Sequence, residues 1–176
     1  MTEIVASIEI SRSPVDVFAY ATDLSRYAEW QPGVTAARLQ GSGPIRAGSR
    51  AVVTRRVGPR TVEYIEEMVE LDPPWRWTVR SIGGLPVTAT ASGAIESLDG
   101  GHRSRITITL DFQAHGIGKL LLPLVVRRQA RKTLPKEAQE LKLTLERPGS
   151  GVTLDTGWGD SSGSRGGEGA SRDQGA

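Results

Sequence analysis

Few residues of this 176-residue chain have the types and spacing that catalysis or metal binding requires. It has two histidines, His102 in a predicted turn and His115 at the end of a predicted strand, and neither has a neighbouring pattern of acids. The chain lacks cysteine, which excludes disulfides, thiolate nucleophiles and cysteine metal sites. It also lacks an HExxH segment and a triad spacing. The sequence therefore predicts no catalytic residue, no metal site and no cofactor.

Phosphate and membrane signals are also missing. Gly41-Ser42-Gly43 is followed by Pro44 instead of a helix start, so it predicts a turn and no phosphate loop. The longest apolar block, 120–126, is far shorter than the about 20 residues of a membrane span. The start of the chain lacks the basic and apolar segments of a signal peptide, so we expect a cytoplasmic protein. A net charge of +2 is too small to indicate a nucleic-acid partner.

Alternating apolar residues at 4–10 predict a first strand, and two short helices follow it. Ser13, Pro14 and Asp16 are typical of a helix start, which predicts a helix over 14–22. Asp23 is expected to cap a second helix over 24–29, whose apolar side ends at Trp30. These two helices are expected to close one end of the fold.

The next part of the chain switches to a period of two, which predicts six strands joined by hairpins. One long helix follows over 117–146, and its apolar stripe is suited to cover the sheet. We expect an α+β protein in which a curved antiparallel sheet of about seven strands wraps around this helix. Residues 1–147 form the predicted domain, and 148–176 form a Gly/Ser-rich tail predicted to be disordered. The predicted strands are 34–39, 50–57, 61–71, 75–82, 87–98 and 103–115.

Several segments in this order resemble one known superfamily. The segments are SIEISRSPVDVFAYATDLSRYAEWQPGV, EEMVELDPPWRWTVR, SRITITLDF and a final helix ending ELKLTLE. Together they resemble the START/Bet v 1-like superfamily (SRPBCC), and within it the bacterial polyketide cyclase/dehydrase and lipid-transport group. The resemblance runs over about residues 4–146. It implies a helix-grip fold with an internal cavity for a small hydrophobic molecule such as a lipid, a polyketide or a quinone.

The resemblance also indicates which side chains would line such a cavity. Apolar positions on the inner faces of the sheet and helix are expected to form its wall. Arg128 follows the apolar stripe of the helix, so it either points into the cavity toward a ligand carboxylate or lies at the surface. The predicted ligand-binding residues are Trp30, Trp77, Ile108, Leu110, Phe112, Leu121, Leu124, Val125 and Arg128.

An enzyme of this superfamily would need polar groups inside its cavity, and the candidates are Tyr64, Glu66 and Arg128. The alternation along 62–71 leaves the first two uncertain. If Val69 and Leu71 face inward, Tyr64 and Glu66 face outward unless a bulge intervenes.

Three functions therefore remain open. The first is binding or transport of a hydrophobic small molecule, and the second is a polyketide cyclase or dehydratase, which two or more buried ionisable groups would favour. The third is a membrane- or protein-interaction module. Residues 119–147 carry eight basic and three acidic residues, which is either a solvated helix face or a patch for an anionic surface. The expected oligomeric state is a monomer or a homodimer.

Overall fold

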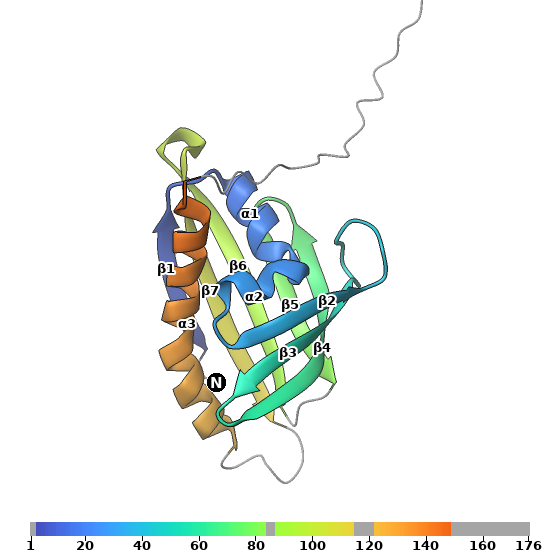
Figure 1. Cartoon of the computed structure of the whole chain (residues 1–176). Coiled ribbons are helices and arrows are strands. Elements are labelled where there is room, and N and C mark those ends of the chain that lie inside the picture. The colour runs from blue at the N-terminus through green and yellow to red at the C-terminus, as the bar shows by residue number, and fades with distance from the viewer. Residues whose placement is uncertain (1–2, 84–86, 115–121, 149–176) are drawn as a thin grey trace, which may run out of the picture.

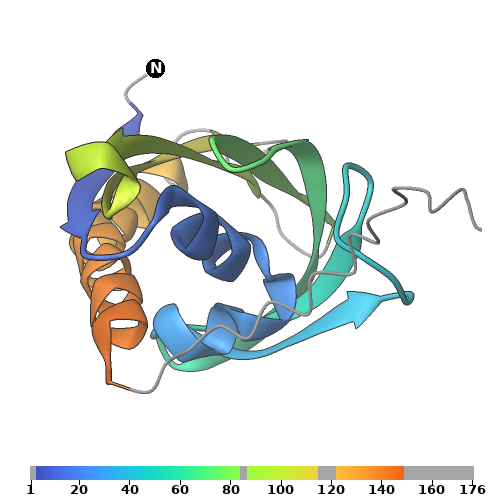
Figure 2. The ribbon, with the colours of Figure 1, turned by 90° about the horizontal axis from the view of Figure 1, so that it is seen from above.

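The computed structural model describes residues 3–83, 87–114 and 122–148. One antiparallel sheet of seven strands curls beside a long C-terminal helix, α3 (Leu122–Glu146), with shorter helices at one end (Figures 1 and 2). The order across the sheet is β1-β7-β6-β5-β4-β3-β2, so the chain builds it by successive hairpins and places the first strand beside the last. The predicted α+β helix-grip fold is confirmed.

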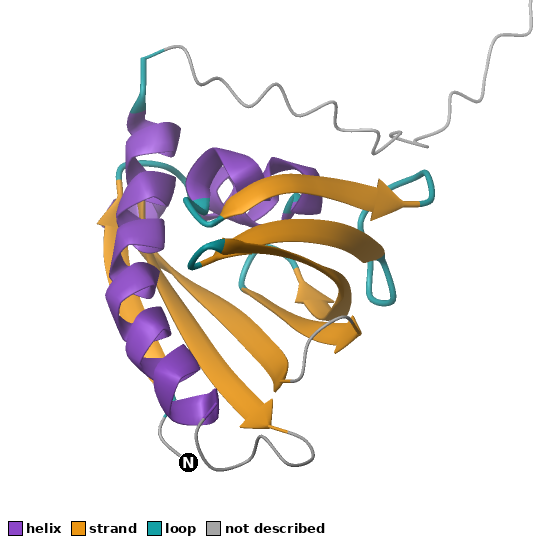
Figure 3. Ribbon diagram, turned by 60° about the horizontal axis from the view of Figure 1, so that its bottom comes forward, coloured by secondary structure: helices purple, strands orange, loops and turns teal. Residues whose placement is uncertain are grey.

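The strands begin and end close to the predicted positions. The long strands β6 and β7 pair along their whole length, β1 flanks β7 on its other side, and Figure 3 shows how the sheet bends away from them toward β2. The strands are β1 (Ile4–Ile10), β2 (Val34–Gln40), β3 (Arg50–Val57), β4 (Arg60–Asp72), β5 (Arg76–Gly83), β6 (Val87–Leu98) and β7 (Arg103–Ala114).

The helices between β1 and β2 begin at the predicted caps. Helix α1 (Pro14–Thr22) starts at Ser13, whose Oγ accepts a hydrogen bond from the backbone N–H of Asp16 at 3.2 Å. A 3₁₀ turn, η1 (Leu24–Arg26), and a single helical turn, α2 (Tyr27–Trp30), follow. Figure 2 shows α1 and α2 lying across the end of the space that the sheet and α3 enclose. A second 3₁₀ turn, η2 (Asp99–Gly101), joins β6 to β7.

Trp77 joins α1 to the inner face of the sheet. Its indole meets the Phe18 ring edge-on, with centroids 5.9 Å apart, and its side chain is 4% exposed. The indole lies directly over Gly93 in the neighbouring strand. A Cβ at Gly93 would come within 2.1 Å of the Trp77 ring, so only glycine fits there.

Helix α3 covers the sheet with an apolar stripe and is tied to β1 at its C-terminal half. Its Lys142 Nζ donates to the carbonyl of Glu9 at 2.9 Å, and Arg12 Nε donates to the carbonyl of Leu145 at 2.9 Å. Within the described residues, no helix is both long and apolar enough to cross a bilayer. The buried residues of the stripe are Ala130, Leu134, Ala138, Leu141 and Leu145.

Some predictions differ from the structure or lie outside it. The strand predicted over 75–82 would place Trp75 on the same face as Trp77, but Trp75 lies in the turn before β5 and is 44% exposed. The turn starts at Asp72, which accepts a hydrogen bond from the Trp75 N–H at 2.8 Å, so the inner-face alternation begins later. His115, residues 117–121 of the predicted helix and 149–176 of the predicted tail lie outside the described residues.

Candidate functional site

An ion pair crosses the interior between the sheet and α3. On β3, Ala51 and Val53 are fully buried, and Arg55 continues the same inward-facing alternation. The Arg55 guanidinium contacts Glu137 of α3, with 3.2 Å between Nη1 and Oε1, and the Glu137 side chain is only 8% exposed. Arg55 Nη2 also donates a hydrogen bond to Gln31 Oε1 just after α2. One arginine therefore links β3, α2 and α3.

Strand β4, which pairs with β3, adds Tyr64 and Glu66 to this interior. Tyr64 is 8% exposed and Met68 is fully buried, so the even-numbered side of β4 faces inward here. Val69 is 36% exposed, so the condition under which Tyr64 and Glu66 would face outward is not met. The reason is a register shift opposite β5 between Met68 and Glu70, which changes the inward parity before Leu71.

Five buried side-chain polar atoms have no hydrogen-bond partner among the described residues. Arg55 Nε and Glu66 Oε2 belong to this cluster, and Trp30 Nε1 is on the residue before Gln31, whereas Arg127 Nε and Thr144 Oγ1 are on α3. The Trp30 indole packs edge-on against Tyr27, and the next residue, Gln31, accepts the hydrogen bond from Arg55. Buried polar groups in native proteins are nearly always paired, so an unpaired set in one region marks a place where a ligand or water belongs. Trp30 and Arg55 can each donate a hydrogen bond from an N–H group to a ligand, and the Glu66 carboxyl group can exchange one with it.

Burial controls the protonation of this cluster. Desolvation raises the pKa of Glu66 to about 7, and the nearby Glu137 carboxylate adds to the rise while the Arg55 charge opposes it. Desolvation also raises the pKa of Tyr64, so its phenol stays protonated near neutral pH. The Glu66 side chain as a whole is half-buried, although its Oε2 atom is fully buried. Glu66 can thus give or take a proton near neutral pH, and Tyr64 can donate a hydrogen bond.

The inner face of the sheet becomes more accessible toward this polar cluster. Along β7, Ile106 is fully buried and Ile108 is 5% exposed, whereas Leu110 and Phe112 are half-buried. Phe112 pairs with Ala89 of β6, and the backbone N–H of Ala89 donates to Ser81 Oγ on β5 at 2.8 Å. Ser81 in turn is paired with Glu66 where β5 lies beside β4. The apolar Phe112 and the polar Glu66 therefore lie along one line that crosses the sheet from β7 to β4.

The predicted ligand-binding residues fall into three groups. Trp30, Trp77 and Ile108 are buried in the core, and Leu110 and Phe112 pack against it while half-buried. Arg128 is exposed on α3, which agrees with the surface alternative for this residue and not with a position inside. Leu121 lies outside the described residues, as do the side chains of Leu124 and Val125.

Sequence reasoning missed Arg55, Gln31 and Glu137. Arg55 shares the period of two with Ala51 and Val53, and Glu137 stands beside Ala138 on the apolar stripe of α3. Both positions therefore carried the signal of a charged residue on a buried face. Gln31 carried no such signal, because it follows the last turn of α2.

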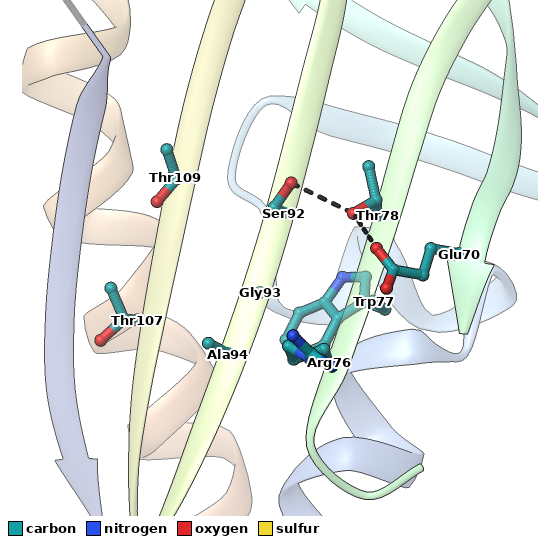
Figure 4. A pocket seen from close by; sticks show the side chains of 9 residues that line it. All are labelled: Glu70, Arg76, Trp77, Thr78, Ser92, Gly93, Ala94, Thr107 and Thr109. Atoms are coloured by element: carbon teal, nitrogen blue, oxygen red, sulfur yellow. Dashed lines mark hydrogen bonds between the residues drawn. The ribbon is translucent and has the colours of Figure 1, made fainter. Parts of the chain in front are cut away.

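A hollow lies on the outer face of the sheet, across β5, β6 and β7 (Figure 4). Its volume of about 210 Å³ is below the roughly 300–1,000 Å³ of typical ligand pockets. Thr78 Oγ1 is hydrogen-bonded to Ser92 Oγ at 3.2 Å and donates to Glu70 Oε2 at 3.3 Å, so these polar groups already have hydrogen-bond partners. We therefore place the candidate site in the interior. The hollow is lined by Glu70, Arg76, Trp77, Thr78, Ser92, Gly93, Ala94, Thr107 and Thr109.

Comparison with known families agrees with this architecture. The family model described as polyketide cyclase/dehydrase and lipid transport matches residues 1–146, which include every described helix and strand. The chain belongs to this family. The resemblance seen in the sequence is thus confirmed, and it places the protein in the START/Bet v 1-like superfamily. A role in ligand binding or in polyketide cyclase/dehydrase chemistry fits the family.

Solved structures of the superfamily share the fold. A START superfamily protein from Mycobacterium smegmatis has a TM-score of 0.69 and 14% identity, covering 82% of this chain and 97% of that one. A protein from Thermus thermophilus has a TM-score of 0.65 and 19% identity, covering 81% and 95%. The Zhui aromatase/cyclase from Streptomyces has a TM-score of 0.63 and 16% identity, covering 79% and 87%. A search of curated protein sequences finds no match.

The described residues contain no group of three histidine, aspartate or glutamate side chains arranged to hold a metal ion. The ionisable side chains of Arg55, Tyr64, Glu66 and Glu137 can form hydrogen bonds, stabilise charge and transfer protons.

Proposed function

We propose that the protein binds a small, mainly apolar molecule in its interior and holds one polar end of it at the Arg55–Glu66 cluster. The observation that carries this proposal is that buried polar atoms of Trp30 (Nε1), Arg55 (Nε) and Glu66 (Oε2) have no hydrogen-bond partner among the described residues. A ligand with a hydroxyl group beside a carbonyl would accept from an N–H donor and donate to the carboxylate. The half-buried Leu110 and Phe112 would contact its apolar body.

Retained ligand is the first test. Native mass spectrometry of the protein purified from its own host, followed by extraction, should find one lipophilic molecule with hydroxyl or carbonyl groups per chain. An empty protein that also binds no member of a lipid and polyketide panel would contradict the proposal.

A matched pair of probes tests the polar end. We expect 2-naphthol to bind about fivefold or more tightly than naphthalene, because a hydrogen bond made in a buried site contributes about 1 kcal/mol. Glu66→Leu should remove this preference, whereas Glu66→Gln should retain it through the amide. Equal affinities for the two probes in the unmodified protein would show that the cluster does not contact the ligand.

A cyclase or dehydratase is the second candidate, and the buried ionisable groups favour it. In a β-hydroxy ketone bound at the cluster, the Glu66 carboxylate would take the proton on the carbon next to the carbonyl. The hydroxyl group would then leave with a proton from Tyr64, producing an alkene and one water molecule. The Arg55 N–H would stabilise the negative charge on the carbonyl oxygen. Loss of one water from a bound β-hydroxy ketone, abolished in Glu66→Gln, separates this enzyme from a carrier.

A further inference from the structure

The exposed side of α3 carries a basic stripe that the interior site does not use. Four cations, Arg128, Arg131, Lys132 and Lys136, are exposed. Arg128, Lys132 and Lys136 recur every four residues, which places them along one side of the helix, and Arg131 lies next to Lys132. Among the described residues, none of the four has a carboxylate within 4.0 Å. The acid nearest in sequence, Glu137, points inward to Arg55. One turn beyond Lys136 the half-buried Glu140 adds a negative charge, so the stripe presents four exposed cations with an excess of positive charge among the described residues.

The same side of α3 continues into an apolar residue, and a neighbouring turn adds more cations. Leu143, further along the exposed side, is 45% exposed. The β3–β4 turn lies beside α3 (Figures 1 and 3), and the ion pair of Arg55 with Glu137 ties the end of β3 to that helix. In this turn Val57 is 50% exposed between the exposed Arg56 and Arg60. Two elements thus combine basic residues with single exposed apolar side chains.

We infer that this surface, defined as the α3 stripe and the β3–β4 turn, docks on a membrane rich in anionic lipid. Each basic residue near an anionic bilayer strengthens binding about fivefold, and exposed Val57 and Leu143 can enter the headgroup region. A nucleic-acid groove would use the cations but not the apolar residues, and the α3 stripe has no aromatic residue for base stacking. The inference goes beyond ligand binding, because neither the stripe nor the turn contributes to the interior cluster.

Vesicle cosedimentation of the full chain tests this inference. We expect binding to phosphatidylcholine vesicles containing phosphatidylserine and little binding to pure phosphatidylcholine, with a steep decrease as salt rises. The double variant Arg131→Glu/Lys136→Glu should bind at least tenfold more weakly. The matched control, Arg46→Glu/Arg80→Glu, changes the net charge by the same amount at exposed positions outside the proposed docking surface. Its affinity for the vesicles should stay within about twofold of the unmodified protein.

Three outcomes would overturn the inference: no binding to phosphatidylserine vesicles at low salt, an equal loss in both double variants, or tight binding to duplex DNA without vesicle binding. The interior site is read separately with 2-naphthol, whose affinity should be unchanged in both double variants. The vesicle experiment can therefore contradict membrane docking without contradicting the proposed ligand site, and the 2-naphthol experiment can contradict the ligand site without contradicting membrane docking.

Discussion

Glu66 is the side chain in which burial has the clearest chemical consequence. Its carboxyl oxygen Oε2 is buried with no hydrogen-bond partner among the described residues, and desolvation raises the pKa of Glu66 to about 7. A carboxyl group that is half protonated near neutral pH suits both a hydrogen-bonding anchor and a proton-transfer group. The proposed roles of Glu66 therefore require that its carboxyl group titrates in this range.

The stability of the folded protein should report this titration. Because the pKa of Glu66 is raised on folding, the folded state holds a proton that the unfolded state has lost between about pH 4.5 and 7. The free energy of unfolding should therefore fall across that window, relative to Glu66→Gln, by roughly 3 kcal/mol, and then stay level above pH 7. Urea unfolding from pH 4 to 8 measures this difference.

The neighbouring Glu67 provides the control for this experiment. It lies on the opposite side of β4 and pairs with Arg50 at 2.7 Å at the surface. Glu67→Gln should not reproduce the pH-dependent difference. A parallel pH profile for wild type and Glu66→Gln would show that Glu66 is solvated and would remove it from the site.

Removal of Arg55 should leave a buried charge behind. Arg55→Met keeps most of the side-chain volume but leaves the Glu137 carboxylate, 8% exposed, without its cation. We expect a loss of about 2 to 3 kcal/mol in the free energy of unfolding, moderated because the Arg55 side chain is 27% exposed. The double variant Arg55→Met/Glu137→Leu should recover much of this loss. If the double variant is no more stable than Arg55→Met, the two residues are not coupled.

At the scale of elements, the sequence predicted most of the fold but not the inner face of β4. Periodicity and turn residues located all seven strands, because alternation and Gly or Pro turns are local signals. The face of β4 depends on the register shift between Met68 and Glu70, which is set by pairing with β5. No residue in that stretch marks a bulge, so the inward positions of Tyr64 and Glu66 could not be read from the sequence.

The candidate site was partly predictable for the same reason. Arg55 and Glu137 each interrupt an apolar face that the sequence reveals, so both could have been selected. Their contact could not, since it joins residues 82 positions apart through the packing of α3 on the sheet. Arg128 was selected because it follows the apolar stripe, but it stands two residues before the buried Ala130, which is about 200° around the helix and on its exposed side.

The contact between Trp77 of β5 and Gly93 of β6 can be tested by mutation. Gly93→Ala should destabilise the protein by roughly 1 to 3 kcal/mol, because its Cβ would collide with the Trp77 ring and push it against Phe18. Thermal unfolding measures the loss. Gly83→Ala is the control, since a Cβ there meets no described atom within 4 Å. If Gly93→Ala and Gly83→Ala have equal stability, the close packing of Trp77 is wrong.

At the scale of the whole molecule, the interior and the basic surface are separate but adjacent. Arg55 lies on the inner face of β3, two residues before Val57 in the exposed β3–β4 turn. Glu137 faces the interior from α3 while Lys136 faces outward. A molecule leaving the interior near this cluster would thus emerge close to the surface that we assign to a membrane, which suits a carrier of a lipophilic compound.

The most direct test of the central claim is a crystal structure of the full chain with the ligand identified by extraction or, failing that, with 2-naphthol. We expect the apolar body of the ligand against Leu110 and Phe112, and a polar atom within about 3 Å of Glu66 Oε2, Arg55 Nε or Trp30 Nε1. A ligand found in the outer hollow beside Thr78 and Ser92, with the interior cluster closed around its own side chains, would contradict the account.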